Sequence, residues 1–514
     1  MFWRSACALI IAVVVLIATA RVAAQHDHPA PEKLGSVTFA TTCSPEVQPQ
    51  FNRAVALLHS FAYSESEKAF REVLAKDPAC AMAHWGVAMT YYHQLWEPPL
   101  NDNSYAKGAS ELAQITKERP RSERESEYIA ALRELYSNAD KKPLHERMIA
   151  YEQSMAKVAK SNASDTEAQV FYALALLSTA PPTDKTHTNQ KKAVAILEPL
   201  YGANPQHPGI PHYLIHAYDN AELARQGVKA ANEYSKIAPS APHALHMPSH
   251  IYTRLGLWNE SVASNQAARK AALEHGDTGE ELHAMDYLTY AYLQLGRTDD
   301  AANVVGDLRQ MSGLQVGGFK IGYAATAMPT RLAVEQRDWK SASSLQAAEN
   351  APPEVSAIAV WARAMGFART RNAKQASLEA EKLGELEGQL RKAGKEYWAD
   401  QVKIQVGEVQ GWIALANRDQ KSAVKSLSAA AELEDSIEKL PRTPGPIIPA
   451  REQYAELLLE LKQADAALTQ FEASLQQSPG RRNALIGASK AAEMAKNEEK
   501  TKLYEAELRK LPQR

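Results

Sequence analysis

The sequence predicts an all-α protein built as a solenoid of antiparallel helix pairs, and three observations support this prediction. Alanine, leucine, glutamate, lysine and glutamine are abundant in the chain, while runs of β-branched residues are scarce, and this balance favours helix. Pro205 and Pro239 are separated by the period of a known helix–turn–helix repeat, about 34 residues. His212 and His246 are separated by the same interval, so histidine recurs in register with the repeat.

Composition limits the class of protein. A hydrophobic content of 45% is ample for a core, but 514 residues are too many for one compact domain unless the architecture is repetitive. The formal net charge of -2 provides no field that would attract nucleic acid or an anionic membrane. We therefore expect no nucleic-acid partner.

Residues 1–24 are predicted to be a secretory signal peptide. Arg4 gives a positive start, residues 7–20 form an apolar run, and residues 22–24 resemble a small-residue cleavage site. A membrane anchor is the alternative, but the run is short for a membrane span and polar residues follow it. We therefore expect an exported protein, periplasmic or secreted, with no transmembrane segment in the mature chain.

Helical patterns follow an extended arm. Residues 25–46 mix Pro, Gly, Ser and Thr without helical periodicity, which indicates the arm. Repeats begin near Val47, and a glycine-rich connection at 306–320 divides them into two solenoid segments, 47–305 and 321–514. The paired prolines near residue 181 predict a loop, and 441–446 is expected to be a rigid linker. Beyond the first repeats, the expected helical segments or pairs are 104–118, 122–137, 143–160, 165–178, 187–201, 321–348, 354–390, 396–437, 449–477 and 481–510.

These repeats resemble the tetratricopeptide repeat over most of residues 47–510. That family carries a small residue at position 8, an aromatic residue at 11, a small residue at 20 and proline at 32. The run ending at Pro479 fits well, with Ala455 at position 8 and Ala467 at 20, whereas Leu57 at position 11 and Ser66 at 20 depart from the pattern. The resemblance implies a right-handed superhelix. The segments HPGIPHYLIHAYD and HMPSHIY are also similar to a group of exported bacterial tetratricopeptide proteins with histidine-rich repeats.

The resemblance implies that eight His and Asp side chains line the concave groove. In the family, positions 2, 5, 9, 12 and 13 of the first helix face the groove, while Leu214, Ile215, Tyr218 and Tyr252 take packing positions here. The i, i+4 spacing within each histidine pair places both rings on one helix face. The expected groove residues are His212, His216, Asp219, His243, His246, His250, His283 and Asp286.

These eight residues are the candidate ligands of a divalent transition metal (zinc, copper or iron). Neutral imidazole is a common ligand for such ions, and an aspartate could ligate or orient a ring. A set without thiolates favours an exposed or catalytic site over a closed structural zinc site. A metal-free polar ligand site and a purely structural hydrogen-bond network remain alternatives.

Four further residues are candidates for ligand or peptide binding in the groove. His59 and His93 are separated by one repeat period and both fall at position 13, Tyr92 adjoins His93, and His207 falls just before its helix. A groove patch of aromatic and histidine side chains could bind a peptide. The alternative is a half-buried packing pair.

The repeat resemblance also implies a disulfide. Cys43 lies just before the first helix of repeat one and Cys80 just before that of repeat two, and adjacent repeats bring such positions together. An even number of cysteines after the signal peptide permits one bond in an exported protein.

Two functions follow from these features. The first is an exported tetratricopeptide scaffold that binds a protein, peptide or small-ligand partner in its groove, with a histidine-lined metal site. The alternative is a metal-dependent enzyme, a hydrolase or oxidase, that uses the same His/Asp cluster and could activate water. A purely structural role is a third possibility, and no phosphate-binding glycine loop or CxxC redox pair is present.

Overall fold

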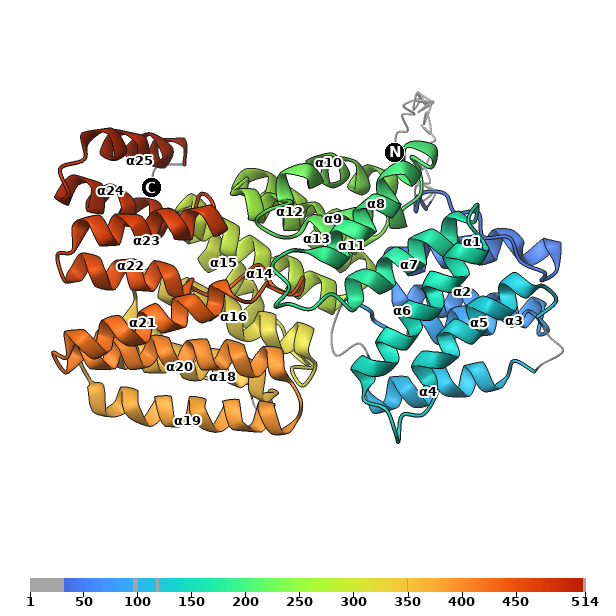
Figure 1. Ribbon diagram of the computed structural model, residues 1–514, viewed down its shortest axis with the longest axis horizontal. Coiled ribbons are helices and arrows are strands. Elements are labelled where there is room, and N and C mark those ends of the chain that lie inside the picture. The colour runs from blue at the N-terminus through green and yellow to red at the C-terminus, as the bar shows by residue number, and fades with distance from the viewer. Residues whose placement is uncertain (1–31, 96–99, 117–119, 349, 512–514) are drawn as a thin grey trace, which may run out of the picture. The chain divides into compact units, whose positions relative to one another are not determined.

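Stacked helices form the regular structure of this protein. The computed structural model describes residues 32–95, 100–116, 120–348 and 350–511. Within these ranges the chain forms α-helices, two short 3-10 helices and no strand. Consecutive helices pack as pairs, from α1 (Gln48–His59) with α2 (Tyr63–Lys76) to α24 (Arg482–Met494) with α25 (Glu498–Lys510) (Figure 1). This confirms the predicted fold class, an all-α tetratricopeptide-like solenoid.

The predicted signal peptide and the first part of the arm, up to residue 31, lie outside the described residues. Residues 33–514 form one compact unit. Among the described helices, none combines the length and the apolar character that a bilayer crossing requires.

The described part of the N-terminal arm has no helix before η1 (Pro45–Val47) and lies across distant repeats. The Ser36 amide donates to the Gln206 carbonyl at 2.8 Å. Phe39 is fully buried, with its ring centroid 5.6 Å from that of Trp85 and 5.2 Å from that of Tyr128. The arm is therefore part of the core, because burying an aromatic ring stabilises its attachment.

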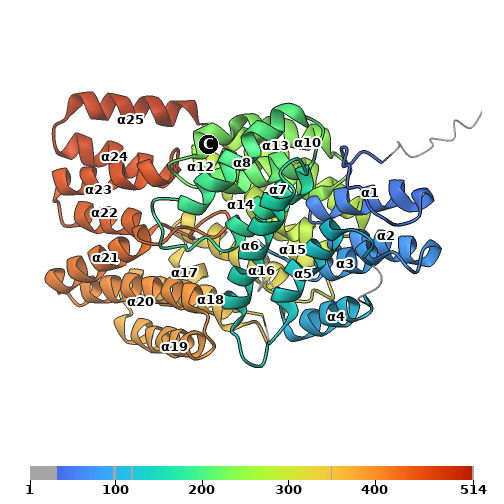
Figure 2. The same ribbon diagram turned by 45° about the vertical axis from the view of Figure 1, so that its right-hand side comes forward.

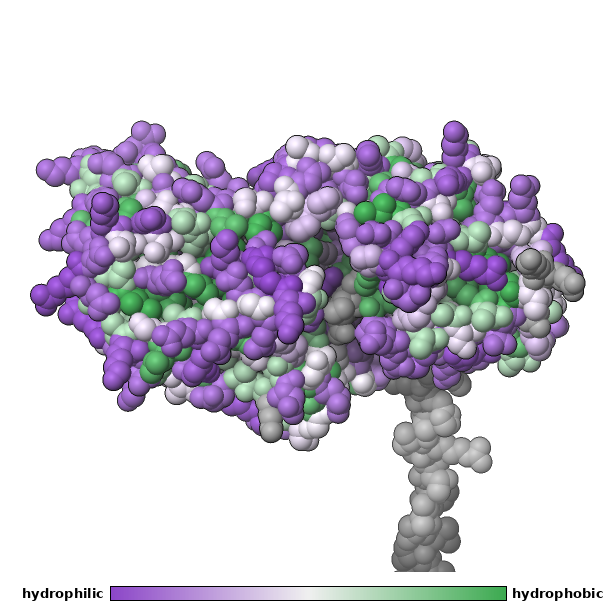
Figure 3. Space-filling model, turned by 60° about the horizontal axis from the view of Figure 1, so that its bottom comes forward, coloured by the Kyte–Doolittle hydropathy of each residue, from purple (hydrophilic) through white to green (hydrophobic). Residues whose placement is uncertain are grey.

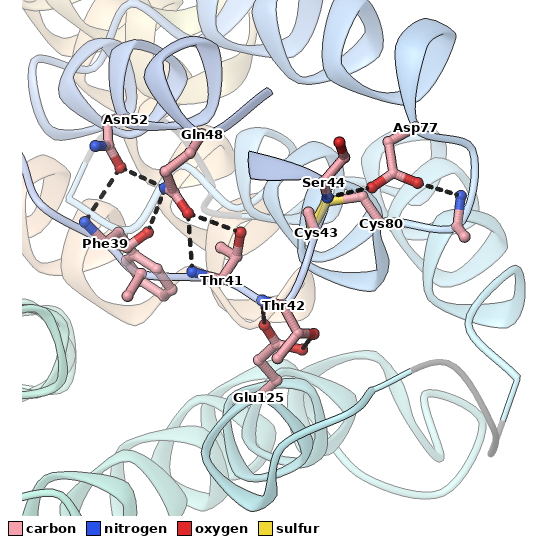
Figure 4. The surroundings of a disulfide bond; sticks show 12 residues. Phe39, Thr41, Thr42, Cys43, Ser44, Gln48, Asn52, Asp77, Cys80 and Glu125 are labelled. Carbon is pink, nitrogen blue, oxygen red and sulfur yellow. Dashed lines mark hydrogen bonds between the residues drawn. A yellow bond between two sulfur atoms is a disulfide. The ribbon is translucent and has the colours of Figure 1, made fainter. Parts of the chain in front are cut away.

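A disulfide ties the arm to the second repeat. Cys43 and Cys80 are bonded, with their Cα atoms 4.8 Å apart, and this is the pair that the repeat frame predicts (Figure 4). Asp77 accepts a hydrogen bond from the Ser44 amide at 2.7 Å beside it. Thr42 donates its hydroxyl to Glu125 at 2.6 Å. These contacts fix the arm on both sides of the disulfide.

Polar caps begin several helices of the first repeats. The side chains of Asn101, Ser122 and Asp165 each accept a hydrogen bond from an amide in the first turn of the helix that follows. Such caps satisfy amides that have no partner within the helix. The remaining helices of this part are α3 (Ala81–Thr90), α4 (Asp102–Ala113), α5 (Glu123–Tyr136), α6 (Leu144–Ser161), α7 (Thr166–Ser178) and α8 (Thr188–Ala203).

A close contact between glycine and phenylalanine recurs at both ends of the solenoid. A β-carbon on Gly86 would lie 2.4 Å from the Phe70 ring, and one on Gly487 would lie 2.2 Å from the Phe471 ring. The offset in sequence from phenylalanine to glycine is the same in both cases. The aromatic ring of one repeat therefore packs directly on the first helix of the next, and a larger residue would separate the two.

The central helices carry the histidines. Two of them, α12 (Pro248–Leu255) and α14 (Thr278–Leu295), end at Gly256 and Gly296, whose φ angles of 69° and 73° are left-handed and suit glycine. The expected connection at 306–320 begins later, because helix continues to Gln310. The other central helices are α9 (Gly209–Tyr218), η2 (Ala224–Gly227), α10 (Val228–Ile237), α11 (Pro242–His246), α13 (Trp258–His275), α15 (Thr298–Gln310) and α16 (Phe319–Glu335).

A segment between two C-terminal helices reaches back to the central helices. We call residues 436–449 the cover segment, and it is the orange-red loop between α21 (Gln420–Asp435) and α22 (Ala450–Glu460) in Figures 1 and 2. Arg331 of α16 donates to the carbonyls of Pro446 at 3.1 Å and Gly445 at 3.0 Å. The Glu438 amide donates to the Pro182 carbonyl at 2.6 Å. The remaining C-terminal helices are α17 (Trp339–Ala342), α18 (Pro353–Arg369), α19 (Ala373–Lys392), α20 (Glu396–Ala416) and α23 (Ala464–Gln477).

The surface is mainly hydrophilic on the face that Figure 3 shows, with small separate hydrophobic areas. Few large apolar side chains are exposed among the described residues, and they are Leu273, Leu378, Met494 and Leu503. Scattered apolar residues of this kind are normal on a water-exposed surface.

Candidate metal centre

Prolines shape the helices that carry the histidine pairs. Pro248 lacks an amide hydrogen and therefore separates α11 from α12, but Met247 between them keeps right-handed helical angles, φ -52° and ψ -37°. His246 and His250 consequently stay on one face across the break, and their Nε2 atoms lie 3.1 Å apart. The Nε2 atoms of His212 and His216 on α9 lie at the same separation, 3.1 Å.

The structure brings six of the candidate histidines together as two triads. The first triad is His212, His216 and His243, and the second triad is His246, His250 and His283. Within each triad, one nitrogen of every ring lies within 4.8 Å of the others. The triads adjoin each other, because the ring centroids of His216 and His250 are 5.7 Å apart.

The expected open groove is wrong for these residues, because the structure buries them. The six histidines are at most 7% exposed, and Asp219 and Asp286 are 6% and 1% exposed. One reason is the turn between α1 and α2, where the Phe61 ring centroid lies 4.4 Å from that of His212. The other reason is the cover segment, whose Lys439 ammonium lies 3.1 Å from the Asp219 carboxylate.

Hydrogen bonds determine which nitrogen carries the hydrogen in two rings of the second triad, His246 and His250. The Asn265 amide nitrogen donates to the Ser261 carbonyl at 2.7 Å, so its oxygen faces His246 Nδ1, also at 2.7 Å. The Asp219 carboxylate faces His250 Nδ1 at 2.9 Å. Amide and carboxylate oxygens only accept, so both Nδ1 atoms carry the hydrogen. In the neutral rings, the two Nε2 atoms that face each other are therefore both lone-pair acceptors.

The first triad has more freedom. His212 Nδ1 donates to the His59 carbonyl at 2.6 Å, which leaves an acceptor at His212 Nε2. His216 Nδ1 has no hydrogen-bond partner among the described residues, so its tautomer is not imposed by an acceptor. A single hydrogen on His216 Nε2 would satisfy this pair without a metal.

Burial favours the neutral form of four of these rings. Removal from water lowers the pKa of His212, His216, His246 and His283 well below the ordinary value, and neighbouring histidines lower the pKa values of all four further. Neutral imidazoles are the form that ligates metals. The site is therefore prepared for a cation without competition from protons at neutral pH.

Two carboxylates contact the Nδ1 atoms of histidines in the triads. Burial would raise the pKa of Asp219, but Lys439 and Arg254 outweigh burial and hold that pKa well below its usual range. Glu280 lies 3.3 Å from His243 Nδ1, and Lys320 and His243 likewise overcome burial and lower the pKa of Glu280. Both carboxylates therefore serve as ionised acceptors for imidazole Nδ1 atoms, the usual partners of ligating histidines.

Asp286 lies elsewhere than the metal hypothesis expects. One of its oxygens accepts from Arg331 at 3.0 Å, and it belongs to neither triad. Burial raises its pKa despite Arg331. Its contact makes it an anchor for the arginine that holds the cover segment.

Another buried histidine group, His59 with Glu167 and His207, has complete hydrogen bonds. Glu167 accepts from His59 Nε2 at 2.8 Å and from His207 Nε2 at 2.9 Å. His59 Nδ1 meets the Tyr213 hydroxyl at 2.9 Å, and His207 Nδ1 accepts from the Gly209 amide at 3.1 Å. Each ring nitrogen has a matching partner, so this group needs no ion.

The expected groove positions of His59, His207 and Tyr92 are also wrong, because these side chains are at most 4% exposed. Tyr92 packs edge-on against Tyr151, with ring centroids 5.6 Å apart. His93 is half-buried, stacks on Tyr63 with centroids 4.1 Å apart, and lines a pocket. Whether His93 binds a ligand stays a prediction.

Two pockets reach the first triad, one at His216 and one at His243. One includes His216, Asp219, Leu177, Pro182 and Lys439 in its lining. The other includes His243, Phe61, His93, Glu280 and Lys320. These pockets provide routes by which a small ligand could approach His216 or His243.

Sequence reasoning missed several residues that complete the site. Glu280 precedes His283 by three positions on one helix, and that spacing could have identified it. Asn265 lies one helix away from His246 and shows no local pattern. Arg254 follows His250 by one helical turn, but Lys439 lies far along the chain, so only the tertiary fold brings it to Asp219.

Comparisons with known proteins give general likeness only. No family model and no curated protein matches the chain. Yeast Tom70 is similar at 11% identity and a TM-score of 0.34, with 88% of this chain and 89% of that chain covered. The human IFIT1 dimer with m7Gppp-AAAA is similar at 14% identity and a TM-score of 0.39, with 93% of this chain and 92% of that chain covered. The P58(IPK) TPR domain is similar at 13% identity and a TM-score of 0.22, with 88% of this chain and 98% of that chain covered. At these TM-scores the likenesses support no argument about ligands.

Proposed function

We propose that this protein is an exported helical-repeat scaffold whose buried histidine cluster binds a divalent transition metal. The observation that carries the proposal is the pair of facing acceptors, His246 Nε2 and His250 Nε2, at 3.1 Å. Two lone pairs at that distance repel each other, and a cation between them removes the repulsion. The remaining ligand is His283, whose ring centroid lies 4.3 Å from that of His246.

The alternatives to a metal each have a cost. Protonating one of the two rings would place a charge in a buried site, and burial lowers the pKa of both His246 and His250. Exchanging the tautomer of His246 would place its lone pair against the Asn265 oxygen. A metal instead fits the geometry, because tetrahedral ligands at about 2.0–2.1 Å from zinc have nitrogens roughly 3.3 Å apart.

The chemistry of the ligands indicates which metals suit the site. Imidazole binds zinc, copper and iron. Each of the two triads consists of three histidines, without a thiolate or a carboxylate. The disulfide between Cys43 and Cys80 suits an oxidising compartment, in keeping with export to the periplasm or beyond the cell. The repeats themselves would provide the surface for a protein or peptide partner.

The test is the metal content of the untagged mature protein after loading and removal of free ion. We expect bound metal in the wild type and a lower content in His246→Ala/His250→Ala. The matched control is His207→Gln, which alters a buried histidine of the complete Glu167 network and should keep the metal. Wild-type protein without stoichiometric metal after loading would reject the proposal.

A metal-dependent enzyme, a hydrolase or oxidase, is the second candidate. The pockets at His216 and His243 favour it, since three histidine ligands leave a coordination position for water or substrate. Loaded and metal-free protein should then differ in ester hydrolysis or phenol oxidation. Equal rates for both preparations, with both types of substrate, would reject the enzyme and leave the metal-binding scaffold as the proposed function.

A further inference from the structure

The structure assigns two metal ions to the cluster, one in each triad, joined as a dinuclear centre by a small bridging anion. This inference rests on the proposed function and extends it from one ion to two. Each triad offers three ring nitrogens within 4.8 Å of one another, so each has the same donor set. The repeat period explains this, because two equivalent histidine pairs lie on adjacent repeats.

Each triad consists of a histidine pair and a third histidine, and the third histidine comes from a different helix in each triad. His243 of α11 completes the pair on α9, with its ring centroid 5.1 Å from that of His212. His283 of α14 completes the pair formed across α11 and α12. Three successive repeat units therefore contribute to the two sites together, two units to each site, and each ion would be held by more than one helix.

The two triads are close enough to share a ligand. The ring centroids of His216 and His250 are 5.7 Å apart, and those of His243 and His246 are 6.0 Å apart. Each of these pairs joins one ring of the first triad to one ring of the second. Paired catalytic ions are typically about 3.5–4 Å apart, a distance that one bridging atom or small anion spans.

Charge accounts for the bridging anion. Six neutral imidazoles leave the charge of two divalent ions uncompensated in a buried site, which is unfavourable. Asp219 already faces Arg254 and Lys439, and Glu280 already faces Lys320, so these carboxylates are largely neutralised. A small anion between the ions would supply the missing negative charge.

Space and polarity for such an anion exist beside the cluster. The pocket at His216 is lined by polar groups of both signs, because the Lys439 ammonium lies there with the Asp219 and Glu438 carboxylates. Tyr287 lies with its ring centroid 4.6 Å from that of His246, and its buried hydroxyl has no hydrogen-bond partner among the described residues. The Tyr287 hydroxyl could therefore donate a hydrogen bond to a bound anion.

The experiment loads the full mature chain with copper(II) and counts ions per chain. We expect two in the wild type, one in His212→Ala/His216→Ala, one in His246→Ala/His250→Ala, and two in the His207→Gln control. One ion in the wild type would overturn the dinuclear centre and leave the proposed function standing. No ion would overturn both.

Wild-type measurements keep the inference testable where a double variant fails to fold. X-ray absorption should show metal–metal scattering at about 3.5–4 Å. The spin resonance of the loaded protein should integrate to fewer spins than the copper present, and azide should add a charge-transfer absorption band. Two ions with full spin intensity and no metal–metal scattering would show separate sites and reject the shared centre.

Discussion

Asn265 offers a direct test of how the protein prepares its metal site. Its oxygen holds the hydrogen of His246 on Nδ1 at 2.7 Å, and this leaves Nε2 as a ligand. In Asn265→Leu, the acceptor is lost, and His246 can carry its hydrogen on Nε2 instead. That hydrogen would bond to His250 Nε2, which already lies at hydrogen-bond distance, 3.1 Å. In the variant, the two rings should therefore form a hydrogen bond with each other in the absence of metal, and metal binding should be weaker.

The expected loss of metal affinity can be taken from the usual effect of removing the hydrogen-bond acceptor of a ligating histidine. Loss of the group behind a ligating histidine typically reduces metal affinity about 10–100-fold. With free metal at about 100 times the wild-type dissociation constant, binding stabilises the wild type by about 2.7 kcal/mol. The same metal concentration should stabilise the variant by only about 0.4–1.4 kcal/mol. Chemical unfolding with and without metal, and competition with a coloured chelator, measure these two quantities.

Asn265→Asp is the matched comparison. Aspartate still accepts from His246 Nδ1, so the metal-binding tautomer is kept and the affinity should be equal or higher. Without metal this variant should be less stable than the wild type, because a carboxylate would face the Ser261 carbonyl in a fully buried place. If Asn265→Leu binds metal as tightly as the wild type, then hydrogen bonding at Nδ1 does not control the site.

Three further predictions concern stability and the cover segment. Replacing Cys43 and Cys80 with alanine should lower the free energy of unfolding by about 3–4 kcal/mol, and reduction of the wild type should match that loss, whereas an unchanged unfolding midpoint would contradict it. Burial lowers the pKa of His93 to about 4, so the folded state binds fewer protons than the unfolded state between that value and 6.5, and stability should fall as pH drops through this window. His93→Gln should reduce that slope, by at most about 3 kcal/mol over the window, and identical acid titrations of unfolding for the two proteins would refute the assignment. Lys439→Met should release the cover segment from Asp219 and make residues 440–446 more sensitive to protease, while equal cleavage rates would show that other contacts hold the segment.

The fold was predictable because its evidence is local. A proline period and small residues such as Ala455 and Ala467 predict helix pairs that contact mainly their neighbours in sequence. The glycine–phenylalanine contacts at Gly86 and Gly487 show that one frame holds at both ends of the chain.

The histidine cluster was predictable in membership and not in exposure. The i, i+4 spacing and the repeat period identified both pairs, and these pairs do come together. The repeat frame assumed an open concave face, but Phe61 and the cover segment close it. Neither Phe61 nor Lys439 carries a local pattern that reveals its contact, because both reach the site through tertiary packing across many residues.

The cover segment has a consequence for the order of assembly. Synthesis proceeds from the N-terminus, and repeat units can form from contacts with their neighbours as they emerge. The histidine helices can therefore fold before residues 436–449 exist, and until then the cluster lacks one wall. An ion could enter during this interval and become enclosed when Lys439 reaches Asp219. In a chain that stops before residue 436, Asp219 would lack Lys439 and the pocket at His216 would lose part of its lining, so metal should exchange faster with the surroundings.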